Sequence, residues 1–271
     1  MIKKILILIF AFLLSPLLLG VWVWFQIPSS EEIRGCMTTR MFQVELCPKN
    51  KSYMPLRQIS PFLVKTVVMT EDSSFWQHRG FDWDSIKKNY EENRKLGRYK
   101  RGGSTISQQL AKNLFLTSEK TLVRKAIEAF ITIRIEQTLT KKEILERYLN
   151  VVEFGKNIYG VKAASRHYFQ KSPSDLTIVE SAFLAMLLPS PVKYSASFYK
   201  KELSPFASRR MDQIIRNLYS FKKISEDEYN YSLVALESFF RPQQINPEGL
   251  ENEIDLTLEN LEQESLEEDR F

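Results

Sequence analysis

Two adjacent carboxylates in the segment TEDSSFWQHRG, residues 70–80, are the first candidates for chemistry in this sequence. Glu71 and Asp72 stand next to a row of aromatic residues, and His78 follows as one of only two histidines in the chain. If the preceding helix continues through the segment, Glu71, Phe75 and His78 lie on one face. A carboxylate beside an aromatic wall has a raised pKa, which suits acid–base catalysis. The alternative is a solvated acidic turn capped by the histidine.

A polar stripe follows in GGSTISQQLAKN, residues 102–113. Helical spacing places on one face Thr105, Gln108, Gln109 and Lys112. Two glutamines and a lysine form a row of donors that suits sugar hydroxyls and phosphate oxygens. The two glycines would let an anion approach the start of the helix. The alternative is an ordinary solvated face, although such faces are more often built from Glu and Lys.

A second carboxylate, Glu128, lies in a basic stretch at residues 124–150. Arg124 precedes it by four residues, and an ordinary helical ion pair alone explains that spacing. The other interpretation is a cluster of cations around the carboxylate, made of Arg124 together with Lys112, Lys120 and Lys125. Glycosidic hydrolysis needs a protonated acid at the leaving oxygen, whereas a departing pyrophosphate needs cations. The pattern therefore favours glycosyl transfer from a phosphorylated donor.

The elements that must position these residues are predicted to be helices. Apolar residues recur at three- and four-residue spacing, and only 9 glycines argue against a turn-rich β-sandwich. We expect a mainly α domain over about 45–240 with little strand. Its helices would cover about 61–75, from Ser104 or its neighbour to Leu116, 122–139 and 140–149. Further helix starts are marked by Thr140 with Glu143, Thr177 with Glu180, Ser204 with Pro205, and Ser225 with Glu228.

An apolar run at the start of the chain predicts a membrane anchor. Ile5 to Ile27 are 23 residues without a charge, long enough to span a bilayer as a helix. Lys3 and Lys4 precede the run, which predicts a cytoplasmic N-terminus and an extracytoplasmic chain after residue 28. A cleaved signal peptide is the alternative, but the run is too long for one and no A-x-A-like site follows.

Two cysteines, Cys36 and Cys47, lie on the expected outer side, in an irregular linker at residues 29–56. In an oxidising periplasm they can form a disulfide that closes a short loop, and two free thiols are the alternative.

Charge divides the chain into a basic body and an acidic tail. Glu248 to Phe271 hold ten acidic residues and one arginine, which leaves +14 on residues 1–247 of a chain with net charge +5. The basic body suits anionic lipid or a phosphorylated substrate, and the outward-facing anchor makes nucleic acid the least favoured partner. The tail, residues 241–271, is expected to be disordered.

In order along the chain, these segments resemble the peptidoglycan glycosyltransferases of family 51, which occur as monofunctional transglycosylases and as modules of bifunctional penicillin-binding proteins. The resemblance covers about residues 60–195. It rests on EDSSFWQHRG (71–80), GGSTISQQLAKN (102–113), RKAIEA (124–129), KKEILERYLN (141–150), GKNIYGVKAASRHYF (155–169) and ESAFLAMLLPSP (180–191). It implies a mainly α, lysozyme-like glycosyltransferase domain at 57–240, preceded by a single transmembrane helix within 1–28 and the linker at 29–56.

The resemblance implies polymerisation of lipid II on the outer side of the inner membrane. Glu71 would be the general base for the acceptor 4-hydroxyl, which attacks C1 of the lipid-linked growing chain with inversion. Glu128 would assist departure of the pyrophosphate, directly or through a divalent cation such as Mg²⁺ or Mn²⁺, although no metal-ligand spacing demands one. The implied substrate-binding residues are Asp72, Phe75, His78, Thr105, Gln108, Gln109, Lys112, Asn113, Lys120, Arg124 and Lys125. Candidate partners are membrane lipid and other cell-wall synthesis or division proteins.

The chain departs from the family pattern at two positions: Lys120 stands where members often have arginine, and Gln170 where glycine is usual. No Lys-Thr-Gly element or room for a transpeptidase domain exists, so a monofunctional enzyme is expected. One rival is a lytic transglycosylase or muramidase. Another is an anchored scaffold without activity, which the retained carboxylates and cations argue against.

The basic and aromatic segment 81–101 is expected to be mobile and to lie against the membrane. Phe81, Trp83, Ile86 and Tyr90 would enter the lipid interface. The basic residues of the segment would meet anionic headgroups: Lys87, Lys88, Arg94, Lys95, Arg98, Lys100 and Arg101.

Overall fold

The structure of the chain is a computed structural model that describes residues 20, 23, 25–97, 103–119 and 121–240. The described residues up to Leu236 form one compact unit. The helices in chain order are α2 (Ser30–Arg34), α3 (Pro61–Glu71), α4 (Trp83–Leu96), α5 (Ile106–Phe115), α6 (Leu122–Thr138), α7 (Lys141–Val151), α8 (Val161–Phe169), α9 (Ile178–Leu187), α10 (Pro191–Tyr194), α11 (Ala196–Lys200), α12 (Pro205–Ser220) and α13 (Glu226–Glu237). The strands form two antiparallel pairs, β1 (Met37–Thr38) with β2 (Glu45–Leu46) and β3 (Glu153–Gly155) with β4 (Ile158–Tyr159). The prediction of a mainly α fold with little strand is confirmed for the described residues.

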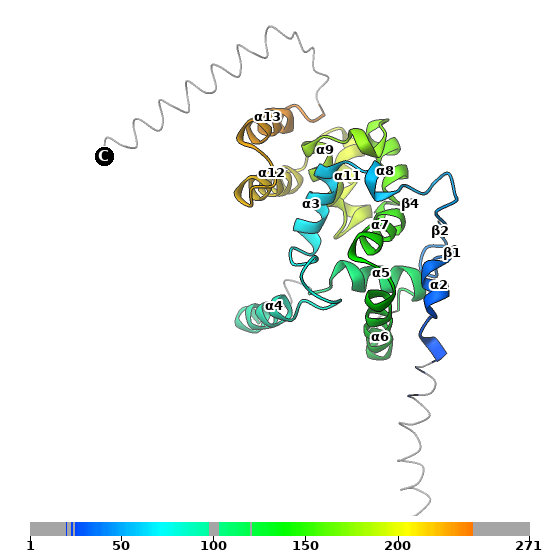
Figure 1. Ribbon diagram of the computed structural model, residues 1–271. Helices are drawn as coiled ribbons and strands as arrows, with labels where there is room; N and C mark the ends of the chain where they lie inside the picture. Colours follow the sequence, from blue (N-terminus) through cyan, green and yellow to red (C-terminus); the bar gives the residue numbers. More distant parts are fainter. Residues whose placement is uncertain (1–19, 21–22, 24, 98–102, 120, 241–271) are drawn as a thin grey trace, which may run out of the picture. The chain divides into compact units, whose positions relative to one another are not determined.

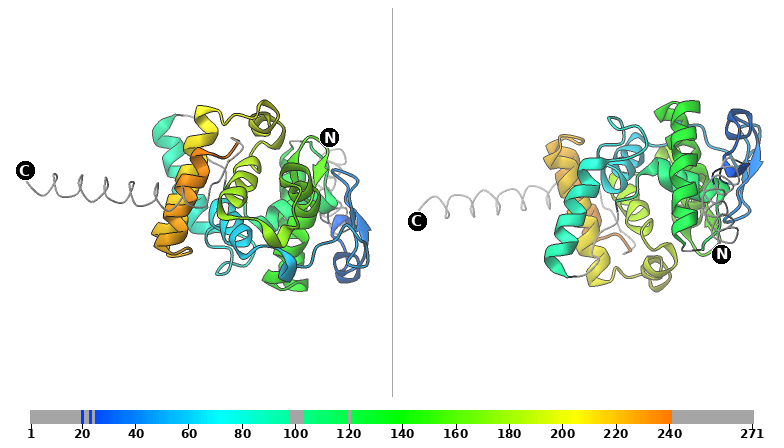
Figure 2. Two further views of the ribbon diagram at one scale, coloured as in Figure 1. Left: turned by 90° about the horizontal axis from the view of Figure 1, so that it is seen from above. Right: turned by 90° about the horizontal axis from the view of Figure 1, so that it is seen from below.

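The helices of this unit pack in two groups. Helix α9 is the centre of one group: all its residues except Glu180 are buried, and it packs on α3 and α12. In the other group α5 packs on both α6 and α7, as Figure 1 shows. Figure 2 gives the same helices from above and below. The C-terminal end of α3 meets the start of α5, where the backbone N–H of Ile106 donates to Asp72, so the two groups join at the segment that carries the first candidate carboxylate.

Capping residues set the helix starts as the sequence predicted. Capping boxes open α7 at Thr140 with Glu143 and α9 at Thr177 with Glu180. Ser204 caps α12. Each box satisfies two backbone N–H groups that a helix start otherwise leaves unpaired, which explains why these boundaries are readable from sequence.

The predicted continuation of α3 into Phe75 is wrong. The helix ends at Glu71, and Asp72 leaves the helical conformation at φ −161°. The Asp72 carboxylate instead accepts from the backbone N–H of Ile106 and from His78, which draws the chain away from the helix axis. Glu71, Phe75 and His78 therefore do not form one helical face, and His78 contacts Asp72.

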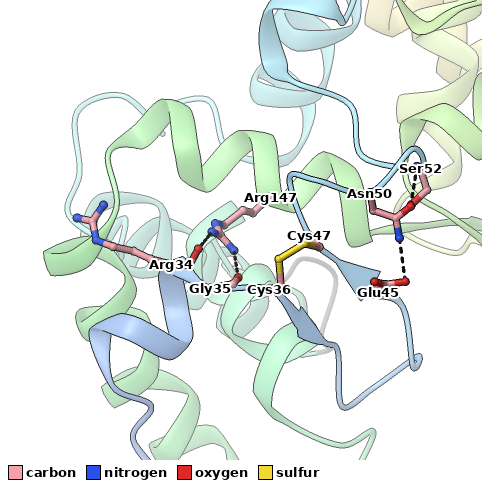
Figure 3. The surroundings of a disulfide bond; sticks show 8 residues. All are labelled: Arg34, Gly35, Cys36, Glu45, Cys47, Asn50, Ser52 and Arg147. Atoms are coloured by element: carbon pink, nitrogen blue, oxygen red, sulfur yellow. Dashed lines mark hydrogen bonds between the residues drawn. A yellow bond between two sulfur atoms is a disulfide. The ribbon is translucent and has the colours of Figure 1, made fainter.

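The stretch predicted as an irregular linker, residues 29–56, contains regular structure. It forms α2 and the β1–β2 hairpin, whose base is closed by a disulfide between Cys36 and Cys47 with Cα atoms 4.3 Å apart. Figure 3 shows Arg147 of α7 beside this disulfide, donating from Nη2 to the carbonyl of Arg34 at 2.5 Å. The disulfide prediction is confirmed, and the segment is fixed to α7 through a buried arginine.

We expect the double substitution Cys36→Ser/Cys47→Ser to lower the free energy of unfolding by about 3 kcal/mol, or the melting temperature by about 6–12 °C, because the unfolded chain loses a closed loop. The measurement is thermal unfolding of the purified protein in detergent. Adding dithiothreitol provides the control: it should lower the wild-type midpoint to that of the double variant and leave the variant unchanged. Equal midpoints for both proteins without reductant would contradict this expectation.

Gln170, at the position where glycine is usual in the family, adopts a left-handed backbone conformation. It ends α8 with φ 59° and ψ 24°, in the left-handed region that favours glycine. Glutamine at this position is therefore held in a backbone conformation that glycine adopts more easily.

No helix among the described residues is long and apolar enough to cross a membrane. Most of the predicted anchor Ile5–Ile27 lies outside the described residues, as do the acidic tail 241–271 and Lys120.

Candidate active site

Asp72 and His78 form a buried pair at the end of α3. The Asp72 side chain accepts from His78 Nε2 at 2.9 Å and from the Ile106 backbone N–H at 2.9 Å, at the first turn of α5. His78 Nδ1 accepts from the backbone N–H of Gly80, so Nε2 carries the hydrogen that Asp72 receives. Burial raises the pKa of the Asp72 carboxyl, partly offset by these hydrogen bonds. The pair fixes the turn that follows Glu71.

Gly80 lies against α6 in a conformation that other residues rarely adopt. Its φ is +95°, and a Cβ atom there would approach Thr132 Cγ2 to 3.0 Å. Its carbonyl accepts from the Thr105 hydroxyl at 2.7 Å. One glycine thus brings together the turn after α3, the start of α5 and the side of α6, the three elements that carry the candidate residues.

Glu71 is half-buried and hydrogen-bonded to α5. Gln109 Nε2 donates to Glu71 Oε2 at 3.0 Å, and the Gln109 carbonyl oxygen accepts from the hydroxyl of Tyr148 on α7 at 3.1 Å. Burial raises the pKa of the Glu71 carboxyl. The Gln109 hydrogen bond and the positive charges of Arg210 and Lys112 oppose that rise. Glu71 is therefore a carboxylate with an increased proton affinity that still has partners for its charged form.

Glu128 has a different environment. It is 2% exposed, and its two oxygens pair with separate cations, Arg124 Nη1 at 2.7 Å and Lys125 Nζ. The Arg124 Nε is buried and has no hydrogen-bond partner among the described residues. Glu128 is thus a fixed anion that holds two cations in place, and one of those cations retains an unused donor.

Lys112 of α5 interacts electrostatically with both carboxylates. Burial lowers the pKa of its ammonium, while the negative charges of Glu128 and Glu71 both raise it. The arginine and lysine paired to Glu128 lower it further. The negative charges of both carboxylates act on this half-buried lysine, so Glu71 and Glu128 are parts of one candidate site.

The other predicted residues have mixed surroundings. Thr105 and Gln108 are buried in the capping box of α5, where each side chain accepts from the backbone N–H of the other. Asn113 is buried within α5. Phe75 is fully buried between Trp76, His78 and the ammonium of Lys141, which lies 4.5 Å from the ring centroid.

Arg210 of α12 is a charged group near Glu71 that the sequence reading did not select. It lies close enough to lower the pKa of the Glu71 carboxyl. In the sequence it is marked only by the pair Arg209–Arg210, which lies beyond the segments that resemble the family. Helix α12 reaches the site because it packs on α3 and α9.

No metal site is formed by the described part of the chain. Within it, no three side chains among His, Cys, Asp and Glu converge as a metal would need. Both Glu128 oxygens face cations, so this carboxylate does not fit the role of ligand to a divalent ion as it is placed.

Known proteins are similar to this chain in sequence. A sequence profile described as Transglycosylase matches residues 38–219. The biosynthetic peptidoglycan transglycosylase of Nitrosospira multiformis is 41% identical over 199 residues, 73% of this chain and 85% of the relative. Those of Azoarcus sp. (52% over 147 residues, 54% of this chain and 64% of the relative) and Shewanella oneidensis (45% over 174 residues, 63% and 73%) are also similar.

The matching family model and the similar proteins identify an enzyme that acts on glycans. The chain belongs to the transglycosylase family.

Proposed function

We propose that this protein is a monofunctional peptidoglycan glycosyltransferase that polymerises lipid II into glycan strands for cell-wall synthesis. The family assignment and the names of the similar proteins support the activity. The observation that supports the mechanism is the contrast between two carboxylates in one site: Glu71 has a raised pKa, and Glu128 is neutralised by cations. The domain is proposed to be lysozyme-like and to occupy about residues 57–240.

Glu71 is the base in this proposal. The 4-hydroxyl oxygen of the acceptor attacks C1 of the lipid-linked chain, its proton passes to the Glu71 carboxylate, and the bond from C1 to the pyrophosphate oxygen breaks. A base with a raised pKa accepts a proton more readily than an ordinary carboxylate. Gln109 holds the carboxylate by its amide N–H, and the Asp72–His78 pair fixes the backbone after it.

Cations assist departure of undecaprenyl pyrophosphate. Glu128 is surrounded by Arg124, Lys125 and Lys112. It supplies one negative charge against three positive ones, so it holds the cations in place and the cluster keeps a net positive charge. The buried Nε of Arg124, which has no hydrogen-bond partner among the described residues, is proposed to donate to a phosphate oxygen. Fixed cations stabilise the charge that develops on the leaving group. Lys120 is proposed to join them.

The rival activity is cleavage of existing glycan strands. A cleaving enzyme needs a protonated acid at the glycosidic oxygen and has no use for a cluster of cations. Incubation with purified lipid II and, separately, with purified glycan strands tests the proposal. Loss of lipid II with formation of polymer is expected. Release of soluble fragments from strands without loss of lipid II would overturn it.

The proposed location is the periplasmic side of the inner membrane, with Ile5–Ile27 as a single-pass anchor and a cytoplasmic N-terminus. The family of the similar proteins makes this a cell-envelope enzyme. The disulfide supports exposure to an oxidising compartment, since such bonds are rare in cytosolic proteins. Lipid II and the growing lipid-linked chain are the proposed substrates.

Helix α4 is proposed to contact the membrane surface. Trp83 is 70% exposed and stacks with Phe81, and Lys87 and Lys88 are exposed beside them. We expect Phe81→Ser/Trp83→Ser, in a chain starting at residue 28, to reduce binding to anionic vesicles at least about tenfold, because two large apolar side chains leave the interface.

The matched control replaces two exposed aromatic residues elsewhere, Phe221 and Tyr231, by serine. Cosedimentation with vesicles measures the binding of both variants. Equal binding by the α4 variant and the control would refute the contact.

A further inference from the structure

Tyr148 is a buried tyrosine that contacts Gln109, the hydrogen-bond partner of Glu71. The proposed mechanism gives it no role. Tyr148 of α7 is fully buried, and its hydroxyl donates to Gln109 Oε1 at 3.1 Å. The same Gln109 donates from Nε2 to Glu71 Oε2 at 3.0 Å. The three side chains come from α7, α5 and α3, so the chain of hydrogen bonds connects the two helix groups.

The amide of Gln109 is useful to Glu71 in only one of its two orientations. With Nε2 toward the carboxylate it donates a hydrogen bond to the charged form. If the amide turned over, its carbonyl oxygen would face the carboxylate and repel it. The Tyr148 hydroxyl supplies the hydrogen that the carbonyl oxygen needs on the buried side, which favours the productive orientation.

We propose that Tyr148 is a positioning residue of the glycosyl transfer, which holds the Gln109 amide with its N–H toward the base Glu71. The inference rests on the proposed function. It adds that the proton affinity of Glu71 is set in part by a hydroxyl that touches neither substrate nor the carboxylate.

Several charged groups also act on Glu71 and remain in place when the hydroxyl is removed. They are Lys112 of α5, Arg210 of α12 and the neighbouring Asp72. Burial, together with Glu71 and Asp72, keeps the pKa of Tyr148 itself well above its ordinary value, so Tyr148 stays a neutral donor throughout the working pH range. Any change of the pH profile on its replacement therefore arises through Gln109 and Glu71.

The test compares two tyrosine-to-phenylalanine substitutions in the full-length protein. Tyr148→Phe keeps the ring and removes the hydroxyl. Tyr168→Phe is the matched control, because Tyr168 is also buried and its hydroxyl donates to the Phe154 carbonyl at 2.8 Å, in α8. The measurement is kcat/KM for lipid II as a function of pH.

For Tyr148→Phe we expect the acid limb of the kcat/KM profile to move to higher pH. At the acid end kcat/KM should fall about fivefold more than at the plateau, which corresponds to the loss of one hydrogen bond of about 1 kcal/mol. Tyr168→Phe should leave the position of the limb unchanged. A limb in the wild-type position for Tyr148→Phe, or equal shifts for both variants, would overturn the proposal.

A measurement without turnover separates this inference from the proposed function. The difference in unfolding midpoint between proteins with and without Glu71→Gln, followed against pH, reports the pKa of Glu71. In the Tyr148→Phe background this pH dependence should move upward, even if lipid II is not the substrate. Failure to consume lipid II with an upward shift would sink the proposed function and keep the hydrogen-bond coupling. The absence of a shift would sink the role of Tyr148.

Discussion

Glu71→Gln is expected to reduce lipid II consumption by about 10²- to 10⁴-fold, the usual contribution of a positioned general base. Glutamine keeps the size of the side chain and can still accept from Gln109, so the site should keep its geometry. What is lost is the ability to take the proton of the acceptor hydroxyl. The measurement is the initial rate of lipid II consumption by the purified full-length protein.

The same substitution should leave the protein at least as stable as the wild type at neutral pH. The pKa of Glu71 is raised in the folded state, so its ionisation is less favourable there than in the unfolded chain. The stability that this group contributes is present below the unfolded pKa and is lost as pH rises through the folded pKa. Replacing a partly desolvated anion by a neutral amide removes this loss.

Glu153 offers a matched control for this prediction. Burial also raises the pKa of its carboxyl, but it lies in β3 and accepts from the Asn157 backbone, outside the candidate site. Glu153→Gln should therefore keep activity within a few-fold of the wild type. If Glu71→Gln were as active as Glu153→Gln, Glu71 would not be the base.

Glu128→Gln is expected to abolish most activity and also to destabilise the fold. The substitution leaves Arg124, Lys125 and Lys112 without their common anion. Breaking a buried ion pair from one side costs about 3–5 kcal/mol, and the partial exposure of both partner cations reduces the expected loss here to about 2–3 kcal/mol. Without the carboxylate the cations separate, and the leaving pyrophosphate loses its preformed site. Thermal unfolding and lipid II turnover measure the two effects.

Glu136 on the same helix is the control for Glu128. It is a largely buried carboxylate that pairs with Lys141 and accepts from the Ser107 hydroxyl, away from the cation cluster. Glu136→Gln should destabilise the fold to a similar degree and retain activity within about tenfold. The account of Glu128 would be contradicted if both variants lost activity equally, because the loss would then follow stability alone. The two candidate carboxylates thus have opposite expected effects on stability.

Local signals made much of the fold predictable. The boxes at Thr140–Glu143 and Thr177–Glu180 are short-range interactions, so four consecutive residues define each helix start. The end of α3 was not predictable in this way. It depends on a hydrogen bond from Ile106 to Asp72, residues separated by 34 positions, and helical periodicity contains no information about it.

The candidate site was predictable as a set of residue types but not as a network. The order of motifs indicated Glu71, Glu128 and their cations. The contribution of Arg210 arises from the packing of α12. That of Tyr148 arises from a buried hydroxyl in a family motif whose sequence does not show which side chain it contacts. Thr105 and Gln108 had the spacing of a polar stripe, yet their hydrogen bonds serve the start of α5, because a capping box has the same spacing.

The central claim is that one half-buried carboxylate, Glu71, accepts the proton in glycosyl transfer. Its most direct test is kcat/KM for lipid II from about pH 4 to 9 with the wild-type protein, a profile that reports ionisations of the free enzyme. We predict a fall on the acid side through one ionisation whose pKa lies above the ordinary glutamate value of 4.5. A rate that stays constant down to the ordinary carboxyl range would contradict the account.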